Sequence, residues 1–368
     1  MGKDSVSYKC PCCGAPLSFL PGHDKVSCEY CGNEFEVKTV EDLYAKQESL
    51  AAKAEAAKES GGWKTDEAGS EWGEQETTGL KTFTCESCGA EIVADENTIA
   101  TECCYCGNPT MLPQRFSGML KPDYVIPFKK TKEEAVTALK AFYKGKKLLP
   151  DVFTANNRME SIQGLYVPFW LFDSKVDGAA EFKTQRSLVY DDGDDTVTET
   201  SFYDCQRSGV AEFAKIPVDG STKMDDTYME SIEPYDYTEM QPFTTAFLPG
   251  YLAEKYDVNA EDSIGRADER VDSSMLELLS GTLENYESQE LTNSYVNKLD
   301  GQVKYALAPV WILTTKYEDT NYTFMMNGQT GKFVGKLPVD KGKLQKYRIM
   351  SFVGASAVVF ALLYGILG

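Results

Sequence analysis

CEYCGN, at Cys28–Asn33, returns with one residue changed as CCYCGN at Cys103–Asn108. Each turn follows an upstream partner, CPCCGAP at 10–16 and CESCGAE at 85–91, so the whole arrangement occurs twice with the same internal spacing. A Cys-x2-Cys turn places two thiolates about one tetrahedral edge apart, and the glycine after each pair lets the backbone N–H groups point at sulfur. The pattern therefore predicts two four-sulfur metal sites, each in a small zinc ribbon.

The predicted ligands are the cysteines that share this spacing: Cys10, Cys13, Cys28 and Cys31 in the first site, and Cys85, Cys88, Cys103 and Cys106 in the second. We expect two structural Zn2+ ions, because four filled positions leave no place for water or substrate. Iron in a rubredoxin-like electron-transfer site is the alternative, since thiolates accept either metal. Cys12 and Cys104 are spare thiols beside the sites, and His23 is interpreted as a solvent-facing loop residue.

The composition limits the compartment and the partners. Ten of the 11 cysteines lie in the two ribbon segments and only Cys205 lies elsewhere, which favours metal binding in a reducing compartment over disulfides. The N-terminus has no apolar core of a signal peptide. The net charge is −20, and neither ribbon has an excess of Lys and Arg, which disfavours nucleic-acid binding as the alternative function.

The sequence offers no recognisable active site. His23 is the only histidine, so Ser-His-Asp and Cys-His catalytic arrangements have no base outside the first ribbon. No phosphate-binding loop, nucleophile elbow or His-Glu-x2-His motif is present. We therefore expect a protein that is not an enzyme.

Residues 41–79, between ribbon 1 (1–40) and ribbon 2 (80–115), are predicted to be a linker. Its first part, 41–60, is rich in alanine and predicts an exposed helix that stops at Gly61. Its second part is acidic and has no periodicity, which predicts a disordered connector. Trp63 and Trp72 within it either pack on a neighbouring domain or anchor a partner.

Residues 116–335 are predicted to be an α+β region. Thr131 and Glu134 form a capping box for a helix that ends at Gly145, and a second helix is expected over 260–279, with Leu278 on its apolar face. The stretches LYVPFWLF (165–172) and LAPVWIL (307–313) are alike, which indicates two related halves, about 120–240 and 241–335. Hairpins are expected around 188–200 and 320–338.

Two residue types in this region were weighed for ligand binding. Trp170 and Trp311, in the two similar stretches, are interpreted as matched core aromatics, with a ligand groove as the alternative. The aspartates near Gly193 lack the spacing and the closing glutamate of an EF-hand, so a solvated turn is favoured over a calcium site.

The C-terminal residues predict a membrane anchor. Residues 349–368 contain no charged side chain, which matches a helix that spans a bilayer about 30 Å thick. The preceding segment, 336–348, carries five Lys and Arg residues against one Asp, which predicts that this side is cytoplasmic. We expect a single-pass protein of the cell membrane with its N-terminal bulk in the cytoplasm.

The doubled cysteine motifs, GLYVPFWLFD (164–173), the segment 309–341 and the apolar terminus together resemble the bacterial TFIIB-type zinc-ribbon-containing proteins. That resemblance runs along nearly the whole chain and implies a membrane-associated protein with zinc ribbons and no established reaction. The expected architecture is α+β: two four-cysteine ribbons, a helical and flexible linker, a duplicated α+β region and a C-terminal transmembrane helix. The expected function is recognition or scaffolding of an unknown protein partner at the membrane.

Overall fold

The computed structural model describes the chain in two compact units. The described residues are 8–12, 14–19, 25–59, 62–73, 75–96, 98, 102–109, 111–116, 118–151, 153 and 159–367. Unit 1 comprises residues 1–66, 172–216 and 264–303, and unit 2 comprises 67–171, 217–263 and 304–368. Three long strands contribute residues to both units: β9 (Gln163–Asp192), β10 (Asp195–Asp219) and β13 (Ser288–Tyr317).

A mixed sheet forms the core of unit 2, and its strands run in the order β11-β8-β13-β9-β12-β6-β5-β7. The shorter strands of this order are β5 (Leu80–Cys85), β6 (Glu91–Asp95), β7 (Met111–Arg115), β8 (Tyr124–Val125), β11 (Gln241–Pro242) and β12 (Leu252–Glu254). Strands β14 (Thr320–Asn327) and β15 (Phe333–Gly335) extend β13 as the predicted hairpin. The mixed α+β class expected from the sequence is confirmed.

Backbone pairing in unit 2 follows an internal two-fold plan. β8 runs parallel to β13 with Tyr124 opposite Ala306, and β12 runs parallel to β9 with Leu252 opposite Leu165. In this plan β8 corresponds to β12, with Tyr124 matching Leu252, and β9 corresponds to β13, with Leu165 matching Ala306. Each half therefore adds a short strand to the long strand of the other half.

The two similar tryptophans lie at corresponding positions of this plan, because Trp170 follows Leu165 at the same spacing as Trp311 follows Ala306. Trp170 Nε1 donates to the Val258 carbonyl at 2.9 Å, and Trp311 Nε1 donates to the Lys130 carbonyl at 2.8 Å. The two acceptor residues also correspond, because Lys130 follows Tyr124 of β8 at the spacing at which Val258 follows Leu252 of β12. Both indole rings are buried, so the interpretation of the two tryptophans as matched core aromatics is confirmed.

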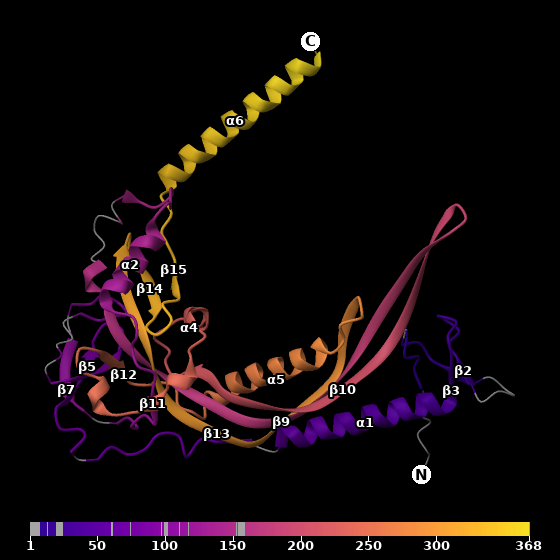
Figure 1. Ribbon diagram of the computed structural model, residues 1–368, viewed down its shortest axis with the longest axis horizontal. Helices are drawn as coiled ribbons and strands as arrows, with labels where there is room; N and C mark the ends of the chain where they lie inside the picture. The colour runs from indigo at the N-terminus through magenta and orange to yellow at the C-terminus, as the bar shows by residue number, and fades with distance from the viewer. Residues whose placement is uncertain are drawn as a thin grey trace. The chain divides into compact units, whose positions relative to one another are not determined.

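Helix α2 (Lys132–Tyr143) packs its apolar face on β14 and β15 (Figure 1). Its capping box is formed as predicted: the Thr131 N–H donates to the Glu134 carboxylate at 2.8 Å, and the Glu134 N–H donates to the Thr131 hydroxyl at 3.3 Å. Leu139 is fully buried, and the Phe142 ring lies 5.0 Å from the Phe333 ring. The short helix α4 (Asp226–Ile232) also belongs to unit 2 and buries Met229 and Ile232.

Unit 1 contains ribbon 1 with its strands β1 (Ser18–Phe19), β2 (Lys25–Ser27) and β3 (Glu34–Glu36), followed directly by helix α1 (Val37–Glu59). Its second helix is α5 (Ile264–Gly281), which begins later than predicted. The buried face of α5 recurs every fourth position, at Ala267, Val271, Met275 and Leu279. The predicted apolar residue Leu278 is exposed instead, because it lies one position away from this row.

The connector predicted to be disordered is packed where the structure describes it. Trp63 lies in β4 (Trp63–Lys64), which pairs with β13 at Gly301, and its indole N–H donates to Asp268 at 2.9 Å. Trp72 contacts the rings of Phe116 and Phe243 edge-on. The residues that contact these two tryptophans are distant in sequence, so the composition of the connector did not predict the contacts.

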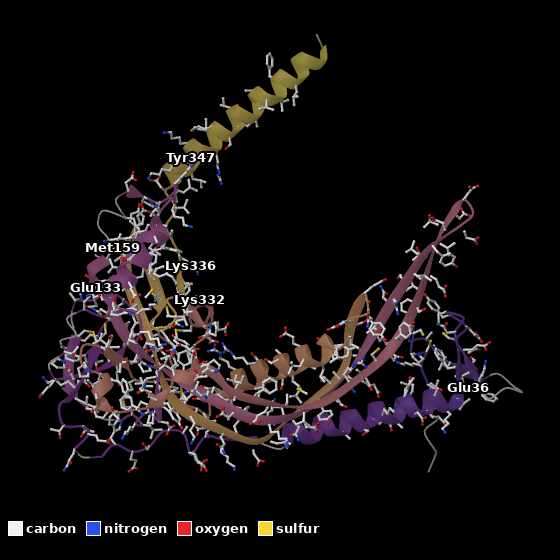
Figure 2. All side chains as sticks on the ribbon, in the orientation of Figure 1. Glu36, Glu133, Met159, Lys332, Lys336 and Tyr347 are labelled. Carbon is white, nitrogen blue, oxygen red and sulfur yellow. The ribbon has the colours of Figure 1, made fainter. Side chains whose placement is uncertain are left out.

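Helix α6 (Lys341–Leu367) contains most of the predicted membrane segment. Its side chains stand out on all sides around and beyond Tyr347 (Figure 2). Among the residues that the structure describes, no helix reaches the length and apolarity that a membrane crossing requires. Gly368 and the side chains of Ala361 and 363–367, which belong to the predicted segment, lie outside the described residues.

Candidate metal centres

The two ribbons have the same backbone geometry at both cysteine turns. The Gly14 N–H donates to the Cys10 carbonyl at 2.8 Å, and the corresponding bond from Gly89 to Cys85 is also 2.8 Å. The second turns match as well, with the Gly32 bond to Cys28 at 2.8 Å and that of Gly107 to Cys103 at 2.9 Å. All four glycines have φ between 69° and 74°, the left-handed region that residues with a Cβ rarely adopt. The glycine after each cysteine pair is therefore required by the turn.

In ribbon 2 the structure brings all four predicted ligands together. The Sγ atoms of Cys85, Cys88, Cys103 and Cys106 all lie within 4.8 Å of one another. Cys85 Sγ is 3.6 Å from Cys106 Sγ, and Cys88 Sγ is 3.6 Å from Cys103 Sγ. Zinc with four sulfurs at about 2.3 Å requires an edge of about 3.8 Å, so the donors fit a tetrahedral ion.

In ribbon 1 the structure brings together Cys10, Cys28 and Cys31, and the Sγ atoms of Cys10 and Cys31 lie 3.5 Å apart. The fourth predicted ligand, Cys13, lies outside the described residues, as does His23. The amide of Asn33 donates to Cys31 Sγ at 3.4 Å, a contact that stabilises a thiolate. Two cysteine clusters that could bind metal ions are thus present, one of four and one of three described residues.

Backbone N–H groups prepare the ribbon 2 cluster for a cation. Burial acts to raise the pKa of the Cys85 thiol, but hydrogen bonds from the backbone of Cys88 and Ser87 and from the Cys106 and Cys88 side chains together lower the pKa. Burial raises the pKa of Cys88 and, to a larger extent, that of Cys103. A bound dication would act against this effect of burial, because it stabilises the deprotonated form of its thiol ligands.

Ribbon 2 is built into the sheet of unit 2. Its strand β6 pairs antiparallel with β12, with Val93 opposite Ala253 and Ile92 opposite Glu254. Ile92, Ala94 and Cys104 belong to the main apolar core of the unit. The Cys104 carbonyl also accepts a hydrogen bond from the Thr314 hydroxyl at 2.8 Å, so this spare thiol residue has a packing role.

A buried carboxyl lies beside the second knuckle of ribbon 2. Glu254 accepts a hydrogen bond from the Ser221 hydroxyl at 2.6 Å, while its other oxygen has no hydrogen-bond partner. The enclosed Tyr105 hydroxyl interacts with this carboxyl but has no hydrogen-bond partner in the part of the chain that the structure describes. Burial raises the pKa of Glu254 to about 7, helped by the charges of Asp257 and Asp219 and opposed by the Ser221 and Tyr105 hydroxyls.

Glu254 was not identified from the sequence. The strand pairing shows that this residue differs in polarity from the residue at the corresponding position of the other strand pair. The corresponding residue of the other half, which follows Tyr124 at the spacing at which Glu254 follows Leu252, is Ile126. Ile126 is buried to the same extent as Glu254, so an apolar side chain can fill this position of the sheet. The buried acid at this place thus differs from its apolar counterpart in the matching strand pair, and it lies next to the cysteine cluster of ribbon 2.

Comparison with known proteins places the chain in a family. The Bacillus subtilis (strain 168) protein named "Uncharacterized protein YdjG" is 35% identical over 339 residues, which cover 92% of this chain and 92% of that protein. The chain belongs to the YdjG family. Since the two ribbons and their linker end at residue 115, the likeness to YdjG must extend far into the long-stranded region. No protein-family model matches the chain, and no solved structure does.

Proposed function

We propose that this YdjG relative is a membrane-anchored, cytoplasm-facing protein in which two zinc ribbons serve the recognition of a partner protein. The observation that carries the proposal is the closed character of the ribbon 2 cluster, in which four sulfurs occupy every position of a tetrahedral ion. A metal held in this way stabilises the turns around it and has no open position for a substrate. The ribbons then act as rigid supports for surface residues.

The surroundings of the clusters support a structural role for the metal. The cavity beside Cys103 and Cys104, about 180 Å3 in volume, is lined by Glu102, Gln163 and residues 312–316 of β13. Its lining contains one carboxyl group and no histidine. This cavity therefore offers no pair of carboxylates for acid–base chemistry.

The proposed anchor is α6. Between Ile349 and Leu362 its exposed large apolar residues are Ile349, Met350, Phe352, Val353, Val358, Val359, Phe360 and Leu362. Such a surface marks a membrane or partner contact. The membrane is favoured because residues 349–368 carry no charge and because Lys341, Lys346 and Arg348, at the N-terminal end of the helix, are exposed.

The test is a pull-down from detergent-solubilised membranes with the full-length protein as bait. The test variants are Cys10→Ser and Cys85→Ser, each of which removes one ligand of a cluster, and the control is Ser280→Ala in α5. The proposal expects a defined partner with the wild type and Ser280→Ala, and its loss with Cys10→Ser, with Cys85→Ser or with both. Equal recovery with all four proteins would show that the ribbons do not serve recognition. Red, iron-containing protein would instead indicate electron transfer.

A further inference from the structure

The two ribbons share their backbone but differ in what covers the second knuckle. Tyr30 and Tyr105 are corresponding residues of the two copies of the motif. Tyr30 is 84% exposed, whereas the Tyr105 hydroxyl is fully enclosed. Phe19 is 60% exposed, and its counterpart Ala94 is completely buried. One face of the ribbon is thus covered in ribbon 2 and uncovered in ribbon 1.

Ribbon 2 shows what this face can bind. Ile92, Ala94, Cys104 and Tyr105 pack into an apolar core that includes Leu252 of β12. The enclosed Tyr105 hydroxyl interacts with the Glu254 carboxyl of the same strand, although neither this hydroxyl nor Glu254 Oε2 has a hydrogen-bond partner among the described residues. The occupant of the face is therefore an apolar protein surface that carries an acceptor opposite the knuckle tyrosine.

The corresponding face of ribbon 1 consists of Leu17, Phe19, Glu29 and Tyr30. Leu17 is half-buried and the other three are exposed. Helix α1 covers a different part of ribbon 1, where the Tyr44 ring lies 5.0 Å from the Tyr8 ring. Strand β1 already pairs with β2 through Phe19 and Val26, so a partner would meet this face mainly through side chains.

The negative charge of Glu29 limits which proteins can bind this face. Glu29 corresponds to Cys104, which is buried where ribbon 2 meets the sheet. A partner seated in the same way would cover the Glu29 carboxylate, and burying an unpaired carboxylate costs several kcal/mol. The partner must therefore place a Lys or Arg against Glu29. This requirement distinguishes it from β12, which meets a neutral thiol at that place.

We infer that ribbon 1 binds a partner protein through Phe19 and Tyr30, on an apolar patch that offers a hydrogen-bond acceptor to Tyr30 and a basic side chain to Glu29. The inference rests on the proposed function and names the surface that performs it. Tyrosine at the centre of such a contact contributes strongly to affinity, because its large ring is buried and its hydroxyl is hydrogen-bonded.

The experiment places the photo-crosslinking residue p-benzoylphenylalanine at position 30 of the full-length protein in its native cells. Position 38 is the matched control, because Lys38 is exposed and lies in the first turn of α1, just after β3. We expect position 30, and not position 38, to form an adduct with one other protein. The crosslinked peptide should contain apolar residues and a Lys or Arg. Adducts of position 30 with lipid or with this same chain, or equal labelling from both positions, would overturn the inference.

Charge reversal supplies a second readout that does not depend on the crosslinker. Glu29→Lys should lower recovery of the partner about tenfold or more, as expected for a close charge pair, while Glu34→Lys on the neighbouring strand should not. Equal recovery with both variants would contradict the inference. If the wild-type protein recovers a partner that both variants also recover, the face assigned here is wrong and the proposed function stands. If no partner is recovered at all, the proposed function itself fails.

Discussion

Replacing Glu254 with glutamine should make the protein more stable at pH 8 than the wild type and change its stability much less at pH 5. Burial raises the pKa of this carboxyl from its ordinary 4.5 to about 7 in the folded protein. Between these values the unfolded chain has lost the proton that the folded protein still holds. The free energy of unfolding of the wild type therefore falls as pH rises through this window, and it levels off above pH 7.

The size of the effect follows from the interval between the two pKa values. It corresponds to about 3 kcal/mol in total, of which about 2 to 3 kcal/mol develops between pH 5 and pH 8. Glutamine has the shape of the protonated acid and can still accept a hydrogen bond from Ser221, which now lies 2.6 Å from the carboxyl. The variant should therefore lack this pH dependence and keep most of the packing.

The assay is urea unfolding at pH 5, 6, 7 and 8, followed by tryptophan fluorescence, for wild type and variant in the same detergent. The difference between the two proteins is the informative quantity, because any loss of metal at low pH affects both. Glu91→Gln is the control, since this carboxylate is partly exposed and pairs with Lys255 at 2.7 Å, so its effect should be below about 1 kcal/mol. A difference between Glu254→Gln and wild type that stays constant from pH 5 to pH 8 would refute the reasoning.

Three further substitutions test other parts of the structure. Tyr105→Ala should destabilise the protein by about 2 kcal/mol or more, because it removes a packed side chain. The corresponding Tyr30→Ala should cost less than about 0.5 kcal/mol of stability. Equal losses of stability would contradict the difference in exposure between the two tyrosines. Gly301→Ala should cost more than about 1 kcal/mol and speed proteolysis near Trp63, since a Cβ there would collide with the Gly62 carbonyl, while Gly209→Ala, which has open space, should do neither. Truncation before Lys341 should release the protein from membranes into a carbonate wash that leaves the full-length chain bound, and release of both would argue against the anchor.

The sequence predicted best where one local pattern determines the geometry. The Cys-x2-Cys-Gly turns and the Thr131–Glu134 capping box need only neighbouring residues, and both are present as expected. The Pro-x-Trp stretches also led to the correct match of Trp170 with Trp311. Each of these signals is carried by a few residues that are close together in the chain.

The rest depends on residues that meet only in the folded protein. Pro127-Phe128 and Pro242-Phe243 look alike in sequence, but Phe128 and Phe243 do not occupy corresponding positions. The strand pairing matches Phe128 with Tyr256, because Phe128 follows Tyr124 of β8 at the spacing at which Tyr256 follows Leu252 of β12. The hydrogen-bond partner of the Trp63 indole is Asp268, far along the chain, which no local pattern reveals. The two knuckle tyrosines lie in nearly identical turns, and only their neighbours Glu29 and Cys104 hint that one is exposed and the other covered.

The central claim, that eight cysteines hold two metal ions, is tested most directly by the metal content of the full-length protein purified without chelators. The account predicts two zinc ions per chain, each with four sulfur neighbours at about 2.3 Å by X-ray absorption, and one ion per chain in both Cys85→Ser and Cys10→Ser. A chain that carries no transition metal, or whose metal content is unchanged by both substitutions, would contradict it.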